Sequence, residues 1–328
     1  MADKIRIGMI GCGGISGGHF RRTLEIPEAE WVALCDISDA SIERVKTAIP
    51  EIKDLPVYED YREMFDKVAL DAVQIATPHT LHFPMGMDAL DKGLHVLMEK
   101  PLVCTVDHAK KLIAKAEEKK RIIALSYQRH YQPAFRYMKQ VIEEGRIGQV
   151  TFLSALQCQQ WKKGTAGKWR QDPCLSGGGQ LNDSGSHLID IILWTTGLAV
   201  DEVSAYIDNL ETPVDINSAL ALRFKNGAQG TVSVIGDAPC WYEDFTIWGE
   251  AGVLFYRNGR LSHCGPDGAI AEPENLPAGG DPDKNFIDAI LGRDVVWAPP
   301  VCGLRVIELT EAAWKSAEAG CAVKVASL

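Results

Sequence analysis

Hydrophobic residues in the first 127 positions form short runs, separated by segments in which apolar residues recur every three or four positions. A short β-branched run bounded by turn residues is typical of a buried strand, and the longer spacing is typical of an amphipathic helix. The runs lie at 4–11, 31–36, 57–58, 70–77, 95–98 and 122–127. Because helices separate these six strands, the pattern predicts an α/β fold with a doubly wound parallel sheet.

The pattern changes after residue 127. A helix is expected after Pro133, a strand over 149–157 and a helix over 181–196. Strand-like runs then follow one another without helices, at 203–207, 218–224, 230–235, 245–248 and 253–257, before two closing helices at 282–291 and 304–319. Consecutive strands joined by short turns pair antiparallel. We therefore expect two domains, 1–127 and 128–328, the second an α+β domain with a mainly antiparallel sheet.

The charge of the chain excludes some classes of partner. The 328 residues include 34 Lys and Arg against 44 Asp and Glu, which gives a net charge of −10. An acidic chain without a long basic run is a poor nucleic-acid binder. No apolar stretch reaches the roughly 18 residues that a membrane-spanning helix needs, and the N-terminus lacks the pattern of a secretory signal. We expect neither nucleic acid nor a membrane as a partner.

The nine cysteines are scattered, odd in number and without a CxxC pair or a tight Cys/His cluster. This distribution disfavours a disulfide framework and a structural zinc site, so no metal is expected. Free thiols are typical of a reducing cytosol, and the predicted location is cytoplasmic.

A glycine loop lies between the first predicted strand and the first helix. Its sequence is Gly11-Cys12-Gly13-Gly14-Ile15-Ser16. Gly11 permits the tight turn, and Gly13 lets the backbone approach a pyrophosphate that rests on the N-terminus of the helix. The third motif position holds Ser16, where Gly or Ala is usual. The alternative is a glycine-rich turn without a ligand, but the position in a βαβ unit predicts a dinucleotide site at Gly11, Gly13, Gly14 and Ile15.

Asp36 ends the second predicted strand, twenty residues after Ser16. A carboxylate there is expected to bind the adenosine ribose hydroxyls and to repel a 2′-phosphate, and no arginine follows directly to receive that phosphate. The sequence therefore favours NAD, with NADP less favoured. A simple turn residue at the strand end is the alternative, but it does not explain the spacing from the glycines.

Two tripeptides follow neighbouring strands of the predicted sheet. Thr77-Pro78-His79 ends the fourth strand and Glu99-Lys100-Pro101 ends the fifth. Ligands of open α/β sheets bind outside the carboxyl ends of the strands, so both tripeptides are expected at the nicotinamide end of the cofactor. Lys100 is an unusual position for a solubilising lysine, although a surface lysine is the alternative.

A second candidate site follows the glycine run Gly177–Gly179. Asp183 and His187 are four residues apart and are predicted on one face of a helix, where the carboxylate orients the imidazole or shares a proton with it. Histidine suits general-base chemistry near neutral pH. Asp190 is a possible second partner. The alternative is a capping aspartate beside a half-buried histidine.

An aromatic and charged segment precedes this pair. Trp169 and Arg170, next to Lys168, offer a ring face and a cation that suit a sugar ring, and Trp161 and Lys162 are weaker candidates of the same kind. The alternative is an exposed loop anchored by one tryptophan.

The chain resembles the Gfo/Idh/MocA family of sugar and cyclitol oxidoreductases over nearly its whole length. The resemblance rests on GCGGIS (11–16), ATPHTLH (76–82), MEKP (98–101) and GGGQLNDSGSHLID (177–190). It implies an open antiparallel sheet in the second domain, with the active site on one face and an oligomer interface on the other. A homodimer or homotetramer is therefore expected.

The resemblance also implies roles for individual residues. Lys100, Asp183 and His187 take the family's catalytic positions: His187 accepts the hydroxyl proton, Lys100 holds the reacting oxygen, and Asp183 binds substrate or holds His187. The segment with His79 and His82 matches the family, and we interpret both histidines as cofactor-side or structural. Gln128 is expected at the nicotinamide. The residues expected on the cofactor side are Thr77, Pro78, His79, His82, Glu99, Lys100 and Gln128. Those expected on the substrate side are Lys100, Trp169, Arg170, Asp183 and His187.

The function that follows is NAD-dependent oxidation of a secondary alcohol in a sugar, sugar acid or cyclitol. The expected substrate is therefore a small carbohydrate or polyol. Two alternatives stay open. Some relatives cleave a glycosidic bond through transient oxidation with the same residues. A few family members are regulators that bind a dinucleotide without catalysis. Such proteins are expected to tolerate loss of the residues at the positions of Lys100 or His187, and both residues are present here.

Overall fold

The computed structural model describes residues 4–325, which divide into two compact units. The first unit takes in the residues up to Val103, Asp107–Gln128 and Gly280–Gly303. The second takes in Cys104–Val106, Arg129–Gly279 and the residues from Leu304 on. The domains 1–127 and 128–328 stay a prediction. Within residues 4–325, no helix is long and apolar enough to cross a membrane.

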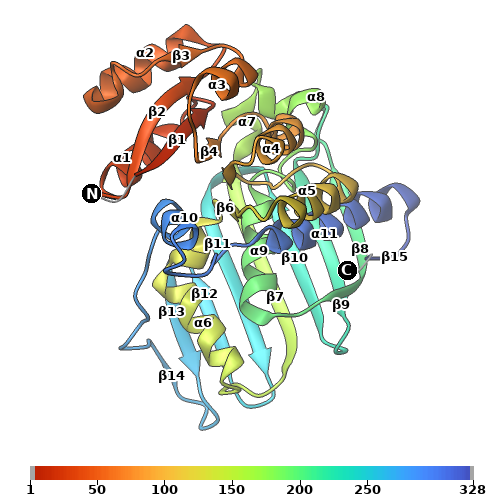
Figure 1. Cartoon of the computed structure of the whole chain (residues 1–328). Coiled ribbons are helices and arrows are strands. Elements are labelled where there is room, and N and C mark those ends of the chain that lie inside the picture. Colours follow the sequence, from red (N-terminus) through yellow and green to blue (C-terminus); the bar gives the residue numbers. More distant parts are fainter. Residues whose placement is uncertain (1–3, 326–328) are drawn as a thin grey trace. The chain divides into compact units, whose positions relative to one another are not determined.

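The first unit is built on a six-stranded sheet in the order β3-β2-β1-β4-β5-β6, and all of its strand pairs are parallel. Helices alternate with the strands along the chain, which confirms the predicted doubly wound α/β fold (Figure 1). The strands are β1 (Ile5–Ile10), β2 (Ala29–Cys35), β3 (Val57–Tyr58), β4 (Ala72–Ile75), β5 (His95–Met98) and β6 (Ile123–Leu125). The helices are α1 (Ser16–Leu24), α2 (Asp39–Ala48), α3 (Tyr61–Lys67), α4 (His82–Asp91), α5 (Val106–Lys119) and α10 (Pro282–Ile290), with short 3₁₀ turns at Pro50–Ile52 and His79–Leu81.

Local sequence signals explain where these elements begin. Ser38 caps α2, as predicted, because its side chain accepts a hydrogen bond from the backbone N–H of Ser41 at 3.2 Å. Every residue of β4 is buried, as expected for a central strand that is covered on both faces. Strands β1 and β2 end at Ile10 and Cys35, one residue before each predicted end, and place the glycine loop and Asp36 at the carboxyl edge of the sheet.

A late segment of the chain completes the first unit. Helix α10 contributes Phe286 and Ile287 to the same buried cluster as Met9 and Phe20. The backbone N–H of Leu125 at the end of β6 donates to the Ala298 carbonyl at 2.9 Å. The helix itself was expected from the sequence, but its place in the core of the first unit was not.

The second unit is built on a nine-stranded sheet in the order β14-β13-β12-β11-β7-β10-β9-β8-β15. The pairs are antiparallel except for β10 with β7, which confirms the predicted mainly antiparallel sheet. The strands are β7 (Val150–Gln160), β8 (Val200–Asp208), β9 (Asn217–Phe224), β10 (Gln229–Ile235), β11 (Asp237–Gly249), β12 (Val253–Arg257), β13 (Arg260–Cys264), β14 (Ile270–Ala271) and β15 (Val323–Lys324).

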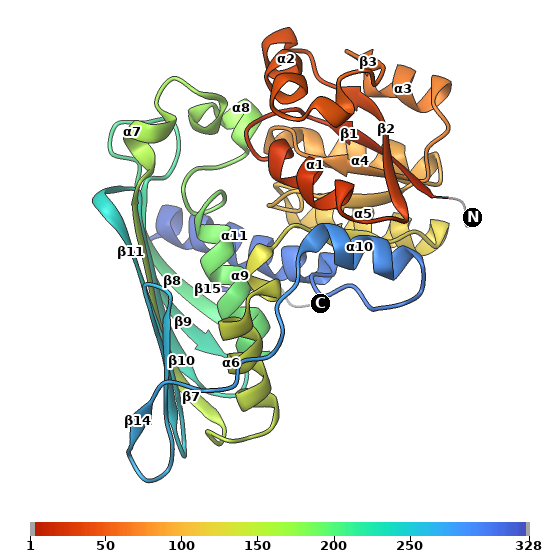
Figure 2. The same ribbon diagram turned by 90° about the vertical axis from the view of Figure 1, so that its left-hand side faces the viewer.

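Three helices of the second unit lie along one face of this sheet. Figure 2 views the sheet nearly edge on, with α6, α9 and α11 on the same side. Buried Ile189 and Ile192 on α9 show why this helix belongs to the core. The helices are α6 (Pro133–Glu143), α7 (Trp161–Thr165), α8 (Pro173–Ser176), α9 (Gly185–Thr196) and α11 (Pro300–Ala319), with 3₁₀ turns at Gln128–Tyr131 and Trp169–Gln171.

Candidate functional site

The glycine loop of the first unit has the shape that a pyrophosphate requires. Gly11 has φ +92°, and a Cβ there would lie 2.6 Å from the Ala76 carbonyl oxygen, so no larger residue fits. A Cβ at Gly13 or Gly14 would meet no atom within 4 Å, so the space above these two residues is open. No side chain in the described part of the chain caps α1, and among its first N–H groups that of Gly18 donates to the Ile15 carbonyl. The N–H groups of Ser16 and Gly17 at the start of the helix are therefore placed to receive an anion.

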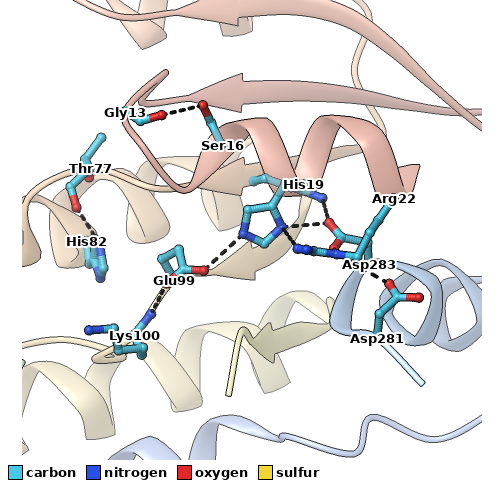
Figure 3. A network of polar contacts seen from close by, with 11 residues as sticks. Gly13, Ser16, His19, Arg22, Thr77, His82, Glu99, Lys100, Asp281 and Asp283 are labelled. Atoms are coloured by element: carbon cyan, nitrogen blue, oxygen red, sulfur yellow. Dashed lines mark hydrogen bonds and ion pairs between the residues drawn. The ribbon is translucent and has the colours of Figure 1, made fainter. Parts of the chain in front are cut away.

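The contacts of Ser16 explain why a serine fits where Gly or Ala is usual. The side chain is fully buried, and its hydroxyl donates to the Gly13 carbonyl at 2.8 Å. Figure 3 shows this bond across the turn of the loop. The hydroxyl therefore fixes the loop through the Gly13 carbonyl and does not fill the open space that a Cβ at Gly13 would enter.

Asp36 is bound to the same loop. Its Oδ2 accepts the Cys12 N–H at 2.6 Å, and its Oδ1 accepts the Ser38 N–H at 2.8 Å. Two backbone donors use only part of the acceptor capacity of a carboxylate, so further hydroxyl donors still fit. Arg44 on α2, which the sequence analysis did not single out, donates to the Cys12 carbonyl at 2.7 Å.

His82 joins the two strand-end tripeptides. It is fully buried, with Nδ1 2.8 Å from the Pro101 carbonyl oxygen and Nε2 3.1 Å from the Thr77 carbonyl oxygen. Burial lowers the pKa of this imidazole, so the neutral ring donates one of these bonds at neutral pH. His79 is also buried. These positions agree with the structural alternative for both histidines.

Glu99 and Lys100 follow β5 as predicted, and the Lys100–Pro101 peptide bond is cis. The Glu99 carboxylate is buried, and its Oε2 accepts the backbone N–H of Lys100 at 3.2 Å. Lys100 is half-buried and Gln128 is exposed. A partner of Glu99 that the sequence did not reveal is His19 on α1, with Nε2 3.0 Å from Oε1.

In the second unit, Asp183 is held by two donors. The indole N–H of Trp161 donates to its Oδ2 at 2.8 Å, and Arg170 Nε donates to the same oxygen at 2.9 Å. The Asp183 side chain is 6% exposed, whereas Arg170 is 36% exposed, so the guanidinium covers the carboxylate from the solvent side. Arg170 also lies over the Trp169 ring, 4.4 Å from its centroid. The structure therefore brings together Asp183, Arg170, Trp169 and Trp161, all predicted from the sequence.

The position of Asp183 differs from the prediction in one respect. Helix α9 begins at Gly185, so Asp183 lies in the turn before the helix and His187 lies in its first turn. The reason is a tight loop closure, in which Asp183 N–H donates to the Gly179 carbonyl and Gly185 N–H donates to the Gln180 carbonyl. The prediction that both residues lie on one helix face was therefore wrong. His187 is half-buried.

A buried carboxylate that the sequence did not reveal anchors this loop. Asp215 accepts the N–H groups of Gly179 at 2.9 Å and Leu181 at 2.7 Å, and the Trp314 indole N–H at 3.1 Å. Burial raises the pKa of Asp215, and these three bonds oppose that effect. The backbone also packs closely, because a Cβ at Gly179 would lie 2.1 Å from the Asp215 carbonyl oxygen. The glycine run is thus required by contact with the segment before β9.

The remaining candidates have structural contacts. Asp190 lies on the buried side of α9, with Oδ2 2.8 Å from His130 Nε2. Lys162 Nζ donates to the Leu210 carbonyl at 2.6 Å. All nine cysteines are free thiols.

Family models match two long segments of the chain. The GFO/IDH/MocA oxidoreductase family with an NAD-binding Rossmann fold matches residues 5–127, and the GFO/IDH/MocA C-terminal domain matches residues 135–255. Levoglucosan dehydrogenase of Pseudarthrobacter phenanthrenivorans is 27% identical, covering 77% of this chain and 74% of the relative. The rhizopine catabolism protein MocA of Rhizobium meliloti is 29% identical, covering 77% and 79%.

Solved structures agree on the fold. A levoglucosan dehydrogenase in complex with NADH has a TM-score of 0.88 at 21% identity, covering 99% of this chain and 100% of that one. The WlbA dehydrogenase of Bordetella pertussis, in complex with NADH and UDP-GlcNAcA, has a TM-score of 0.86 at 23% identity, covering 100% and 99%. At these identities the likeness concerns the fold. The matches of the two family models, to residues 5–127 and 135–255, establish that this chain belongs to the GFO/IDH/MocA family of oxidoreductases.

Proposed function

We propose that the protein oxidises a secondary alcohol of a sugar, sugar acid or cyclitol with a nicotinamide cofactor. The observation that carries the proposal is the open glycine cradle above Gly13, at the same sheet edge as Lys100. An alcohol oxidation needs a hydride acceptor, a base and a group that stabilises charge on oxygen, and no metal is required. Named relatives are dehydrogenases, so the glycoside-cleaving and regulatory alternatives are not favoured.

The residues of the chain take the following roles in this proposal. His187 accepts the hydroxyl proton, and Lys100 donates a hydrogen bond to the reacting oxygen and stabilises its developing charge. The cofactor, when bound, supplies the hydride acceptor. Asp183, held by Trp161 and Arg170, orients the substrate, and the Trp169 ring supports an apolar face of a sugar.

The cofactor side of the proposal includes the whole edge of the first unit. We propose that Gly11, Gly13, Gly14 and Ile15 bind the pyrophosphate and Asp36 the adenosine ribose. Ile15 is 40% exposed beside the open cradle. Residues expected towards the nicotinamide are Thr77, Pro78, His79, His82, Glu99, Lys100 and Gln128. Of these, buried His82 acts through the Pro101 and Thr77 carbonyls that it contacts, and buried His79 packs against the His82 ring.

The direct test is an assay with NAD and a panel of sugars, sugar acids and cyclitols, monitored by formation of the reduced cofactor. We expect turnover with at least one polyol and NADH binding in the micromolar range, as is ordinary for such enzymes. NAD binding without reduction by any member of the panel would count against an alcohol dehydrogenase. Cleavage of an aryl glycoside with substoichiometric NAD would point to the alternative chemistry.

We further propose NAD rather than NADP as the preferred cofactor, because Asp36 is a carboxylate fixed beside the loop by Cys12 and Ser38. Asp36→Ala is expected to lower kcat/KM for NAD about 10- to 100-fold, the value of hydrogen bonds to a charged group, while kcat/KM for NADP stays the same or rises. Asp36→Asn keeps an acceptor for the Cys12 N–H and serves as the control for loop geometry. If the ratio of kcat/KM for NAD to kcat/KM for NADP is the same in Asp36→Ala as in the wild type, the assignment of Asp36 to the adenosine ribose is contradicted.

Location and assembly complete the proposal. The nine free thiols favour a cytoplasmic protein. We propose a homodimer or homotetramer formed through the sheet face of the second unit that lies opposite α6, α9 and α11. Buried residues alternate with more exposed ones along β7 and β8, and the exposed set, which includes Tyr206 at 83% and Phe152 at 37%, belongs to this face. Light scattering of the purified protein measures the assembly, and a monomer at micromolar concentration would contradict it. The acidic charge continues to argue against nucleic acid as a partner.

A further inference from the structure

A buried histidine in the first unit lies between two carboxylates. His19, on α1, is 1% exposed. Its Nδ1 lies 2.7 Å from Asp283 Oδ1 and its Nε2 lies 3.0 Å from Glu99 Oε1. Figure 3 shows the imidazole between these two groups, which come from α10 and from the end of β5. A ring between two ionised carboxylates has both contacts satisfied only when both nitrogens carry a proton.

The charges around this histidine can be named element by element. Asp283, fully buried, also accepts Arg22 Nε at 2.5 Å and Gln74 Nε2 at 2.7 Å. Arg22 Nη2 lies 3.1 Å from His19 Nδ1, and both side chains contact the Asp283 carboxylate. On the other side, the Lys100 charge also acts on Glu99. Asp281 lies 3.8 Å from Arg22 at the edge of the network.

These charges decide the protonation of the group. Burial alone would lower the pKa of His19, but the charges and hydrogen bonds of Asp283 and Glu99 raise it to about 9. Burial would likewise raise the pKa of Glu99, but His19 and Lys100 lower it to about 2. Burial opposes ionisation of Asp283 too, and His19 and Arg22 nevertheless lower its pKa. At neutral pH the network therefore consists of two carboxylates, an imidazolium and a guanidinium.

The network connects the two functional parts of the first unit. His19 lies one turn after Ser16, which fixes the glycine loop. Glu99 immediately precedes Lys100 and accepts its backbone N–H through the carboxylate oxygen that His19 does not contact. The cradle and the lysine are therefore linked through one side chain.

We propose that His19 is a positioning residue, which as an imidazolium holds Glu99 and thereby sets the backbone of Lys100 relative to the glycine cradle. The inference rests on the role of Lys100 in the proposed function. The competing interpretation is that the network stabilises the core and has no influence on Lys100. The two interpretations differ in what happens when only one of the two contacts of His19 is removed.

Two variants separate the contacts. The amide nitrogen of Asn takes the place of Nδ1, and that of Gln takes the place of Nε2. His19→Asn therefore keeps the bond to Asp283 and loses Glu99, whereas His19→Gln keeps Glu99 and leaves Asp283 to Arg22 and Gln74. We expect kcat of His19→Asn to fall at least tenfold below that of His19→Gln, because small displacements of a reacting group are costly. Equal kcat values in folded samples of the two variants would overturn the proposal.

A second readout does not depend on turnover. The rate at which a limiting acylating reagent labels Lys100, quantified by peptide mass spectrometry, depends on the burial of this amine and on the charges near it. We expect His19→Asn to change that rate at least threefold and His19→Gln to stay near the wild-type rate, with surface Lys110 as the internal standard. Equal labelling in all three proteins would overturn the positioning role. If no polyol is oxidised by the wild type, the proposed function fails, and this measurement still decides the inference.

The charge of His19 has its own test in the pH dependence of stability. Because the pKa in the folded protein, about 9, lies above the ordinary value of 6.5, the imidazolium stabilises the fold fully below pH 6.5 and this contribution disappears as the pH rises towards 9. The melting temperature of the wild type is expected to fall more between pH 6.5 and 9 than that of His19→Gln, which has no titrating group there. Parallel pH profiles would show an uncharged His19 and overturn the proposal. Should neither His19 variant fold, Glu99→Gln tests the same link, with altered labelling of Lys100 expected and wild-type labelling contradicting it.

Discussion

Lys100→Ala is expected to lower kcat by roughly 10²- to 10⁴-fold while the dissociation constant for NADH changes only a few fold. The amine is proposed to stabilise charge that develops on the substrate oxygen, and the loss of such a group affects the transition state far more than the ground state. The fold should survive, because Glu99 bonds to the backbone N–H at position 100, which alanine retains, and because the side chain is half-buried rather than part of the core.

The measurement is steady-state kinetics on the best substrate of the panel, with NADH binding followed by fluorescence. Lys92→Ala is a matched control, since Lys92 is a 50% exposed lysine of the same unit that pairs with Asp66. Surface ion pairs of this kind contribute little, so the control should behave as the wild type. Full turnover by Lys100→Ala would remove the lysine from the mechanism.

Gly179→Ala is expected to have the second largest effect, on the stability of the second unit. The new Cβ would lie 2.1 Å from the Asp215 carbonyl oxygen and 2.6 Å from its nitrogen, and both are backbone atoms that no side-chain rotation can move. The loop must then shift, which breaks the bonds that Asp215 makes to it, and the free energy of unfolding should fall by about 3 kcal/mol or more. Activity should fall as well, because Asp183 follows in the same loop.

Urea denaturation measures this loss, and Gly164→Ala is its control. Gly164 lies in α7 of the same unit, and a Cβ there would meet no atom within 4 Å. Alanine in a helix is favoured over glycine by up to about 1 kcal/mol, so the control should be as stable as the wild type or slightly more stable. If Gly179→Ala unfolds at the same urea concentration as the wild type, the close contact with Asp215 is not a constraint on the protein.

Much of the fold follows from patterns that are local in the sequence. The alternation of short apolar runs with helical segments predicted the parallel sheet, and the change of pattern after residue 127 predicted the antiparallel one. The boundaries were less accurate where a loop closes on itself. Helix α9 begins at Gly185 rather than near residue 181, because the turn is set by bonds to Gly179 and Gln180 that no helix propensity predicts.

The parts of the site that the sequence did not reveal depend on contacts between distant residues. His19 and Asp283 are 264 positions apart, and Gly179 is 36 positions from the carboxylate that holds it. Glycine spacing, a strand-end lysine and an Asp/His pair have recognisable local signatures, whereas a single buried histidine or aspartate has none. Arg170 and Asp183 each have such a local signature, but the bond between them is seen only in the structure.

The return of residues 280–303 to the first unit has a consequence for synthesis. When the ribosome has completed residue 128, all six strands of the parallel sheet exist, but Phe286, Ile287 and the Asp283 carboxylate do not. Until those residues emerge, His19 and Arg22 lack their shared anion and part of the apolar core is uncovered. The nascent first unit can therefore complete its core only after about 150 further residues have been synthesised, which takes roughly ten seconds or more. We expect a fragment that ends at residue 128 to aggregate or to require a chaperone.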